Sequence, residues 1–249
     1  MNKTATRLPA DPGHLHLRYT LVHGLLDDPH ERTLEAWKVS IRHGYEVHDV
    51  TRCPAPGEEA GDCLREDCPA LQEDGVEIGH MAFYRARLAQ GATNAFWAME
   101  EESQELSEIA EVLLDPATGY FTEDAGQQLA YAGTDLLVMD QVVLVKPWRG
   151  LGLGTVFAAE AISRLGIGCR AIACVPGISD YEDDWRPQQA EWDRITARIT
   201  SAWQRVGFTL YRDGVYLLEP NSEAAEEHLA AARVAFHDLC AAWRTTAPD

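Results

Sequence analysis

The stretch from Asp135 to Leu165 constrains the fold of this chain more than any other part of the sequence. Asp135 to Val145 is a near-continuous apolar run (DLLVMDQVVLV), which is typical of a strand covered on both faces of a sheet. A glycine-rich turn follows, and Gly152 to Leu165 has the pattern of a helix. A buried strand that leads through glycines into a helix predicts a mixed α/β sheet with this strand near its centre.

Further strands are predicted on both sides of this unit. Alternation of apolar and polar residues, or a short buried run, indicates four of them, at His16–His23, Leu34–His43, Val76–Leu88 and Arg170–Val175. Two short strands near the end of the chain are joined by Asp213-Gly214, a strong hairpin signal. These two strands are expected at Phe208–Arg212 and Val215–Glu219.

Three more helices are expected. Thr93 to Leu114 places its apolar residues mostly on one helical face, with Thr93 or Asn94 as the cap and Asp115-Pro116 as the stop. The opposite face of this inserted helix is acidic. The other two helices are expected at Thr196–Val206 and at Glu223–Trp243, the second of which is rich in alanine and closes the chain.

Two acidic, proline-containing stretches are expected to be surface loops, Thr51–Gly75 and Gly177–Asp193. The first contains Cys53, Cys63 and Cys68, with His43 and His48 before it. Their spacing does not match the paired ligands of a zinc site, so we expect reduced thiols and no metal.

Composition excludes several classes of function. The 249 residues carry a formal net charge of −19, with 40 acidic and 21 basic side chains, so a main partner that is nucleic acid is not expected. No apolar run is long enough for a membrane helix, and Met1 to Asp11 lacks the apolar core of a signal peptide. We expect a cytoplasmic protein with residues 1–14 extended or disordered, one domain over 15–220, and a C-terminal helix over 221–249 packed on it.

The glycine-rich turn is the segment that carries chemistry. Gly150, Gly152 and Gly154 let the backbone approach a ligand closely, and the first amides of the helix point at the same place with the positive end of its dipole. This arrangement suits a phosphate, with Arg149 at its mouth. Gly154-Thr155 lacks the lysine of a Walker loop, and no G-x-G-x-x-G is present. A turn whose glycines serve packing alone is the alternative.

The same residues carry a family resemblance. Arg149-Gly150-Leu151-Gly152-Leu153-Gly154 resembles the Arg/Gln-x-x-Gly-x-Gly/Ala signature of the GNAT superfamily of N-acetyltransferases. Val145-Lys146-Pro147-Trp148 is similar to the approach to that signature, and Ala202 to Phe208 (AWQRVGF) to the family's later helix, which runs into Gly-Phe. The resemblance implies a mostly antiparallel twisted sheet with a central splayed strand pair, flanked by helices. The C-terminal helix would be an addition.

This resemblance implies a co-substrate, acetyl-CoA or another acyl-CoA, whose acyl group passes to a primary amine of a small molecule or peptide. Val143 and Val145 would pair with the pantetheine arm. The pyrophosphate would be held by the turn and the helix start, at Arg149, Gly150, Leu151, Gly152, Leu153, Gly154 and Thr155. The net charge favours a cationic acceptor by long-range steering, and a homodimer is a further possibility.

The catalytic residues are less well defined by the resemblance. Trp203 stands where many members have a tyrosine that protonates the thiolate, and Tyr211 is the nearby candidate for that role. Gln141 stands where many members have a glutamate, and the acid here is one residue earlier, at Asp140. Strand alternation would place Asp140 and Gln141 on opposite faces. Two other functions stay open: a CoA-binding sensor without turnover, and an acidic interaction protein whose glycine turn binds nothing.

Overall fold

A computed structural model describes residues 8–26, 28–44, 47–48, 71–72, 75–130, 132–177 and 189–246. Seven strands form one open sheet in the order β1-β2-β5-β6-β7-β9-β8, and every neighbouring pair is antiparallel except β6 and β7. The bounds are β1 Leu15–Leu21, β2 Leu34–His43, β5 Val76–Ala86, β6 Asp135–Leu144, β7 Cys169–Cys174, β8 Thr209–Arg212 and β9 Val215–Leu218. Two short strands, β3 (Val47–His48) and β4 (Leu71–Gln72), pair separately.

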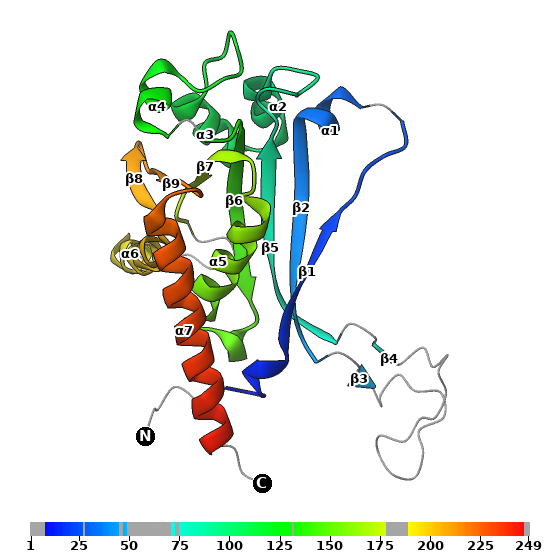
Figure 1. Cartoon of the computed structure of the whole chain (residues 1–249), viewed down its shortest axis with the longest axis vertical. Coiled ribbons are helices and arrows are strands. Elements are labelled where there is room, and N and C mark those ends of the chain that lie inside the picture. The colour runs from blue at the N-terminus through cyan, green and yellow to red at the C-terminus, as the bar shows by residue number, and fades with distance from the viewer. Residues whose placement is uncertain are drawn as a thin grey trace.

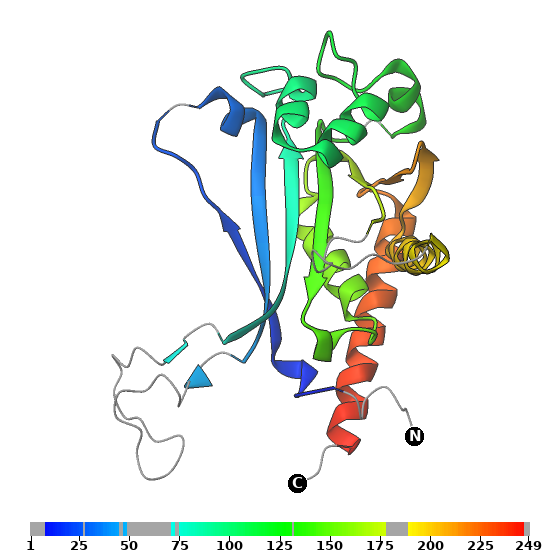
Figure 2. The same ribbon diagram turned by 180° about the vertical axis from the view of Figure 1, so that it is seen from behind.

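Helices cover both faces of the sheet. On one face lie α5 (Leu153–Leu165), α6 (Gln189–Val206) and α7 (Glu223–Thr246) (Figure 1). Their core includes Phe157 of α5 packed with Phe83 and Leu137 of the sheet. On the other face lie α2 (Ala95–Glu102), α3 (Gln104–Leu113) and α4 (Glu123–Gln128), grouped at one end of the sheet (Figure 2). A short helix, α1 (Pro29–Thr33), leads into β2.

The predicted strands agree with the observed strands to within two residues at each end. β6 begins at Asp135 as expected and is the fourth of the seven strands. Its first five residues, through Met139, are all buried. The hairpin between β8 and β9 turns at Asp213 and Gly214, which have φ angles of 48° and 82°. The fold is therefore α/β with a mostly antiparallel sheet, as expected.

The single helix expected over Thr93–Leu114 is wrong, because the chain breaks it into α2 and α3 at Ser103. Ser103 is extended, with φ −159° and ψ 162°, and its side chain accepts a hydrogen bond from the N–H of Leu106. A serine in this conformation ends one helix and caps the next. The expected cap is confirmed at the other end, where the Asn94 side chain accepts from the N–H of Phe96 at 2.9 Å.

The start of α6 also differs from the expectation. The helix begins at Gln189 rather than Thr196, so residues 189–193 of the expected acidic loop are helical. At the other chain end, Leu8 is only 6% exposed and belongs to the main core. Pro12 to His14 form a helical turn capped by Asp11. Residues 8–14 are therefore packed on the domain rather than disordered.

Most of the expected insertion at Thr51–Gly75 lies outside the described residues, as do Cys53, Cys63 and Cys68. Within the part of the chain that is described, no group of three or more histidine, cysteine, aspartate or glutamate side chains is placed to hold a metal ion. No helix among the same residues is both long and apolar enough to cross a membrane.

β6 contains a bulge that reverses the expected orientation of Gln141. Ala82 of β5 pairs with Gln141, but the next residue, Phe83, pairs with Met139, so Asp140 is an extra residue in β6. Neighbouring residues of β5 face opposite sides, so Met139 and Gln141 face opposite sides although they are two apart. Such bulges re-aim side chains. The expected alternation across Asp140 and Gln141 is therefore wrong.

Candidate functional site

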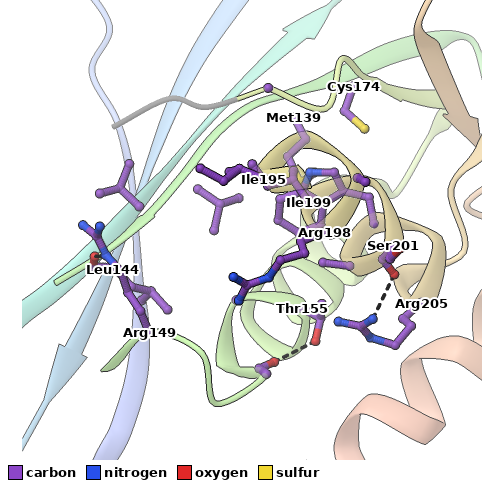
Figure 3. A pocket seen from close by; sticks show the side chains of 18 of the residues that line it. Met139, Leu144, Arg149, Thr155, Cys174, Ile195, Arg198, Ile199, Ser201 and Arg205 are labelled. Atoms are coloured by element: carbon purple, nitrogen blue, oxygen red, sulfur yellow. Dashed lines mark hydrogen bonds between the residues drawn. The ribbon is translucent and has the colours of Figure 1, made fainter. Parts of the chain in front are cut away.

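The central strands separate beyond Val138. The parallel pairing of β6 with β7 ends at Val138 and Ala173, yet β6 continues to Leu144. A cavity of about 930 Å³ lies beside the length of β6 that β7 does not pair, and it extends to the glycine turn and α6 (Figure 3). We call it the strand-edge cavity. Its lining from the two strands is Met139, Asp140, Val142, Val143, Leu144 and Cys174.

The backbone groups that face the strand-edge cavity are not the expected ones. The N–H of Val145 donates to the carbonyl of Ile78 at 2.9 Å, so Val145 faces β5. Val143, two residues earlier, faces the same way. The carbonyl of Leu144 instead accepts a hydrogen bond from Nε of Arg149. The backbone groups of Leu144 and, by the same alternation, of Val142 therefore face the cavity. The expected pairing of Val143 and Val145 with a pantetheine arm is wrong, because the backbone groups of these two residues face β5.

The glycine turn has the backbone that the sequence predicts. Gly150 and Gly152 have φ angles of 75° and 80°, and an added Cβ at either would meet nothing within 4 Å. Positive φ thus requires glycine there, and the space beside the turn is open. Just before the turn, Trp148 is only 5% exposed and anchors it in the core. The turn is fixed on one side and accessible on the other.

α5 starts at this turn without a side-chain cap. Gly152 is the N-cap and supplies no side-chain cap, so the first N–H groups have no partner from that residue. Thr155 donates its hydroxyl to the carbonyl of Gly152 at 2.7 Å, within the first turn. An ideal Cβ on Gly154 would lie 3.9 Å from Val142. Any side chain at Gly154 would therefore enter the space between the turn and β6.

Positive charge is concentrated around the strand-edge cavity. Arg149 comes from the turn, and three arginines of α6, Arg194, Arg198 and Arg205, line the opposite wall. Figure 3 shows Arg198 extending from α6 toward the space between Arg149 and Thr155. Asp140 is the one carboxylate among the described lining residues. In a chain of net charge −19, this cavity is a locally positive region, and such a region attracts anions.

Asp140 also belongs to an acidic group on the other face of the sheet. Burial raises the pKa of its carboxyl, and the charges of Glu105 and Glu102 raise it further. The pKa of Tyr84 is raised to about 12, first by burial and then by the charges of Glu102 and Asp140. Asp140 thus lies between the strand-edge cavity and the side chains of α2 and α3. A carboxyl with a raised pKa is a stronger base than an ordinary one.

A second hollow, of about 640 Å³, opens on this acidic side. Tyr84 of β5 and Glu102 of α2 line it, together with Asp28, Glu31 and Glu35. Two arginines, Arg32 and Arg87, also line this hollow, and Arg87 forms a 2.7 Å ion pair with Glu35. We call it the acidic hollow. Its carboxylates suit a cation, in contrast to the arginines of the strand-edge cavity.

The structure does not bring every predicted residue to the strand-edge cavity. Those that line it are Asp140, Val143, Arg149, Gly150, Gly152, Gly154 and Thr155. Leu153 is buried in the core, and Leu151 packs against it. Trp203 lines the cavity, in the position where the resemblance would place a tyrosine.

Tyr211 lies elsewhere. Its hydroxyl donates to Oδ2 of Asp124 in α4 at 2.7 Å, and Tyr211 does not line the cavity. Burial and this hydrogen bond raise the pKa of Tyr211. The geometry therefore does not support Tyr211 as a proton donor at the strand-edge cavity.

Sequence reasoning missed the three arginines of α6. Arg194 and Arg198 are one helical turn apart, and Arg205 follows two turns later on the same side. This spacing was a usable signal. It was hidden because Arg194 falls outside the expected helix, which was placed from Thr196 onward.

Comparisons with known proteins give no family. No protein-family model matches the sequence, and no curated protein matches it. Two chains of solved structures match. One of them, described as the crystal structure of KacTA-DNA complex, is 7% identical, with alignment over 90% of this chain and 99% of that chain and a TM-score of 0.33. A likeness at that score carries no argument about the function of this chain.

Proposed function

We propose that this protein is an acyl-CoA-dependent N-acyltransferase of the GNAT type, acting on a primary amine. One observation carries the proposal. A strand with an open edge leads into a positive-φ glycine turn at the start of α5, and arginines surround the cavity between them. Coenzyme A matches this arrangement, because its amide-containing arm can pair with the open strand edge and its diphosphate can bind at the glycine turn and the arginines.

The diphosphate would lie over Gly150 to Gly154. The first amides of α5, which no N-cap side chain satisfies, and the positive end of the helix dipole favour an anion at that position. Arg149 and Arg198 add fixed charge from two sides. The pantetheine arm would pair along Val142 and Leu144, which face the cavity, in the manner of an added strand. Its thioester would then lie near Asp140.

The chemistry at that point is direct transfer. The lone pair of a neutral amine attacks the thioester carbonyl carbon, a C–N bond forms, the C–S bond breaks, and CoA leaves as a thiolate. Asp140 accepts the amine proton, directly or through a water, and its raised pKa suits that role. The thiolate takes its proton from solvent. The protein contributes mainly positioning.

The acceptor would approach from the acidic hollow. Glu102 lines this hollow and interacts with both Asp140 and Tyr84, so a cation held there would present an amine near the thioester. We therefore expect a cationic small molecule or peptide as the acceptor. The net charge of −19 favours its encounter with the protein at low salt.

A CoA-binding sensor is the second candidate function. The observation that favours it is the lining of the strand-edge cavity, which among the described residues includes Trp203 and no tyrosine or histidine. Such a protein would bind acyl-CoA and release no thiol. Turnover separates the two candidates.

Two measurements test the proposal in sequence. Acetyl-CoA at 100 times its dissociation constant should stabilise the fold by about 2.7 kcal/mol, which raises the melting temperature by about 5–10 °C for a chain of this size. Thiol release is then followed with a panel of di- and polyamines and lysine-containing peptides. A shift with release supports the transferase, and a shift without release supports the sensor. No shift with acetyl-CoA or any longer acyl-CoA contradicts both.

A further inference from the structure

A third hollow adjoins the strand-edge cavity where α7 packs against the rest of the domain. It has a volume of about 690 Å³ and lies between the start of α5, the second half of α6 and the middle of α7. We call it the α7 cavity. It shares four lining residues with the strand-edge cavity, namely Gly152, Thr155, Ser201 and Arg205. The two cavities therefore meet at the glycine turn and the start of α5.

The walls of the α7 cavity are suited to a flat aromatic ring with a polar edge. The apolar part of its α7 side is formed by Ala231, Ala232, Ala235, Phe236 and Leu239, and His228 lines the same side. Gln204 of α6 and Asp238 of α7 add hydrogen-bonding groups, and Arg205 adds a positive charge at the junction. A purine base needs apolar faces and polar edge partners of this kind.

The position of α7 is fixed by contacts outside this cavity. Arg233 forms a two-point ion pair with Glu160 of α5, with Nη2 donating to Oε2 at 3.0 Å. Farther along α7, Cys240 is only 7% exposed and Trp243 packs against the main core. The wall is therefore held in place before any ligand binds, which lowers the entropic cost of binding.

We propose that the α7 cavity binds the adenosine end of the coenzyme, so that the C-terminal helix completes the CoA site. This inference rests on the proposed function. With the diphosphate over Gly152, one end of the molecule continues along β6 and the other continues around the start of α5 into the α7 cavity. Arg205, which lines both cavities, lies next to the 3′-phosphate.

A matched pair of substitutions on α7 tests the base-binding wall. Ala235 lines the α7 cavity, whereas its neighbour Val234 is 61% exposed and does not line it. Ala235→Phe should fill the cavity and raise the Kd of CoA at least 10-fold. It should leave the Kd of 4′-phosphopantetheine, which lacks the nucleoside, unchanged. Val234→Phe should change neither value. Titration calorimetry measures both ligands, and circular dichroism checks that each variant is folded.

The contribution of Arg205 is tested with a second ligand pair. Arg205→Gln should weaken the binding of CoA about 10-fold while leaving dephospho-CoA, which lacks the 3′-phosphate, within twofold of wild type. Equal loss for both ligands would contradict the assignment of Arg205.

The outcomes separate the two proposals. If Ala235→Phe binds CoA as tightly as wild type while wild type binds CoA well, the adenosine end lies elsewhere and the proposed function survives. If wild-type protein binds neither CoA nor 4′-phosphopantetheine, the proposed function itself fails. If Ala235→Phe weakens both ligands equally, the effect is not specific to the nucleoside and the inference is overturned.

Discussion

At Asp140, one extra residue in β6 changes what two neighbouring side chains can reach. The bulge places this carboxyl at the strand-edge cavity and in the field of Glu102 and Glu105. Gln141 pairs with Ala82 and faces the same side of the sheet as Tyr84. A carboxyl that borders both the cavity and the acidic side can take a proton from an amine that enters between them.

Asp140→Asn should lower kcat/KM for the amine about 100-fold, because the proposed general base is lost while the shape of the side chain is kept. On the acid side of the wild-type pH profile, kcat/KM should fall at a pH above the ordinary pKa of an aspartate, because burial and the charges of Glu105 and Glu102 raise the pKa of Asp140. Glu108→Gln, which removes a charge from the exposed side of α3, is the control and should leave kcat/KM unchanged. A variant Asp140→Asn with wild-type kcat/KM would contradict the role.

The same substitution should stabilise the fold at neutral pH. The pKa of Asp140 is raised in the folded state, so ionisation favours unfolding, and stability falls as pH rises through the interval between the ordinary and the raised pKa. Asparagine cannot ionise. We expect a gain at pH 7 of less than about 1 kcal/mol, because solvent screens the half-buried carboxyl, and no gain below about pH 3. Urea unfolding at both pH values measures it, and a loss at pH 7 would contradict the assignment.

At the scale of elements, an ion network joins three adjacent strands. Arg87, which follows β5, lies 2.7 Å from Glu35 of β2 and 3.3 Å from Asp135 at the start of β6. Asp135 is only 5% exposed, so removal of Arg87 leaves a buried charge whose other cationic neighbour, Arg85, lies farther away, at 3.9 Å. The network fixes the end of β6 opposite to the one where the cavity opens.

Arg87→Met should therefore destabilise the fold by about 2–3 kcal/mol. The control is Lys38→Met, which removes a 3.7 Å pair with Glu77 from a side chain that is 60% exposed. Its expected cost is below about 0.5 kcal/mol. Urea unfolding measures both, and equal effects of the two variants would show that the network adds nothing.

The elements were predictable from sequence where the hydrophobic pattern is continuous. β6, β2 and the β8–β9 hairpin have clear apolar runs or turn residues, and their bounds agree closely with the observed ones. The break between α2 and α3 was not predictable in this way, because the apolar face continues across Ser103 while the backbone does not. Tertiary packing decided that boundary rather than periodicity.

The candidate site was predictable from sequence only at the glycine turn, where the backbone conformation requires a particular residue type. Gly150 and Gly152 need positive φ, which the sequence implies directly. The bulge at Asp140 was not predictable, because one extra residue leaves the apolar composition of β6 unchanged, and it reverses the orientation of Gln141. Which backbone groups face the cavity depends on strand register, and register is not visible in a single sequence.

At the scale of the whole molecule, the charged side chains that line the cavities differ between the two sides of the sheet. Arginines of the turn and α6 surround the strand-edge cavity, and carboxylates of α1, β2 and α2 line the acidic hollow. Asp140 lies between them. Under the proposed function, the anionic donor would bind on the arginine side and the cationic acceptor on the carboxylate side.

The central claim is that the glycine turn holds the diphosphate of an acyl-CoA. Gly152 and Gly214 form a matched pair, because both have φ near 80° and an added Cβ at either meets nothing within 4 Å. Titration calorimetry with acetyl-CoA should show one site in wild type and in Gly214→Asp. Gly152→Asp should weaken binding at least 100-fold, since a carboxylate there repels the diphosphate. Equal binding by Gly152→Asp and wild type would contradict the claim.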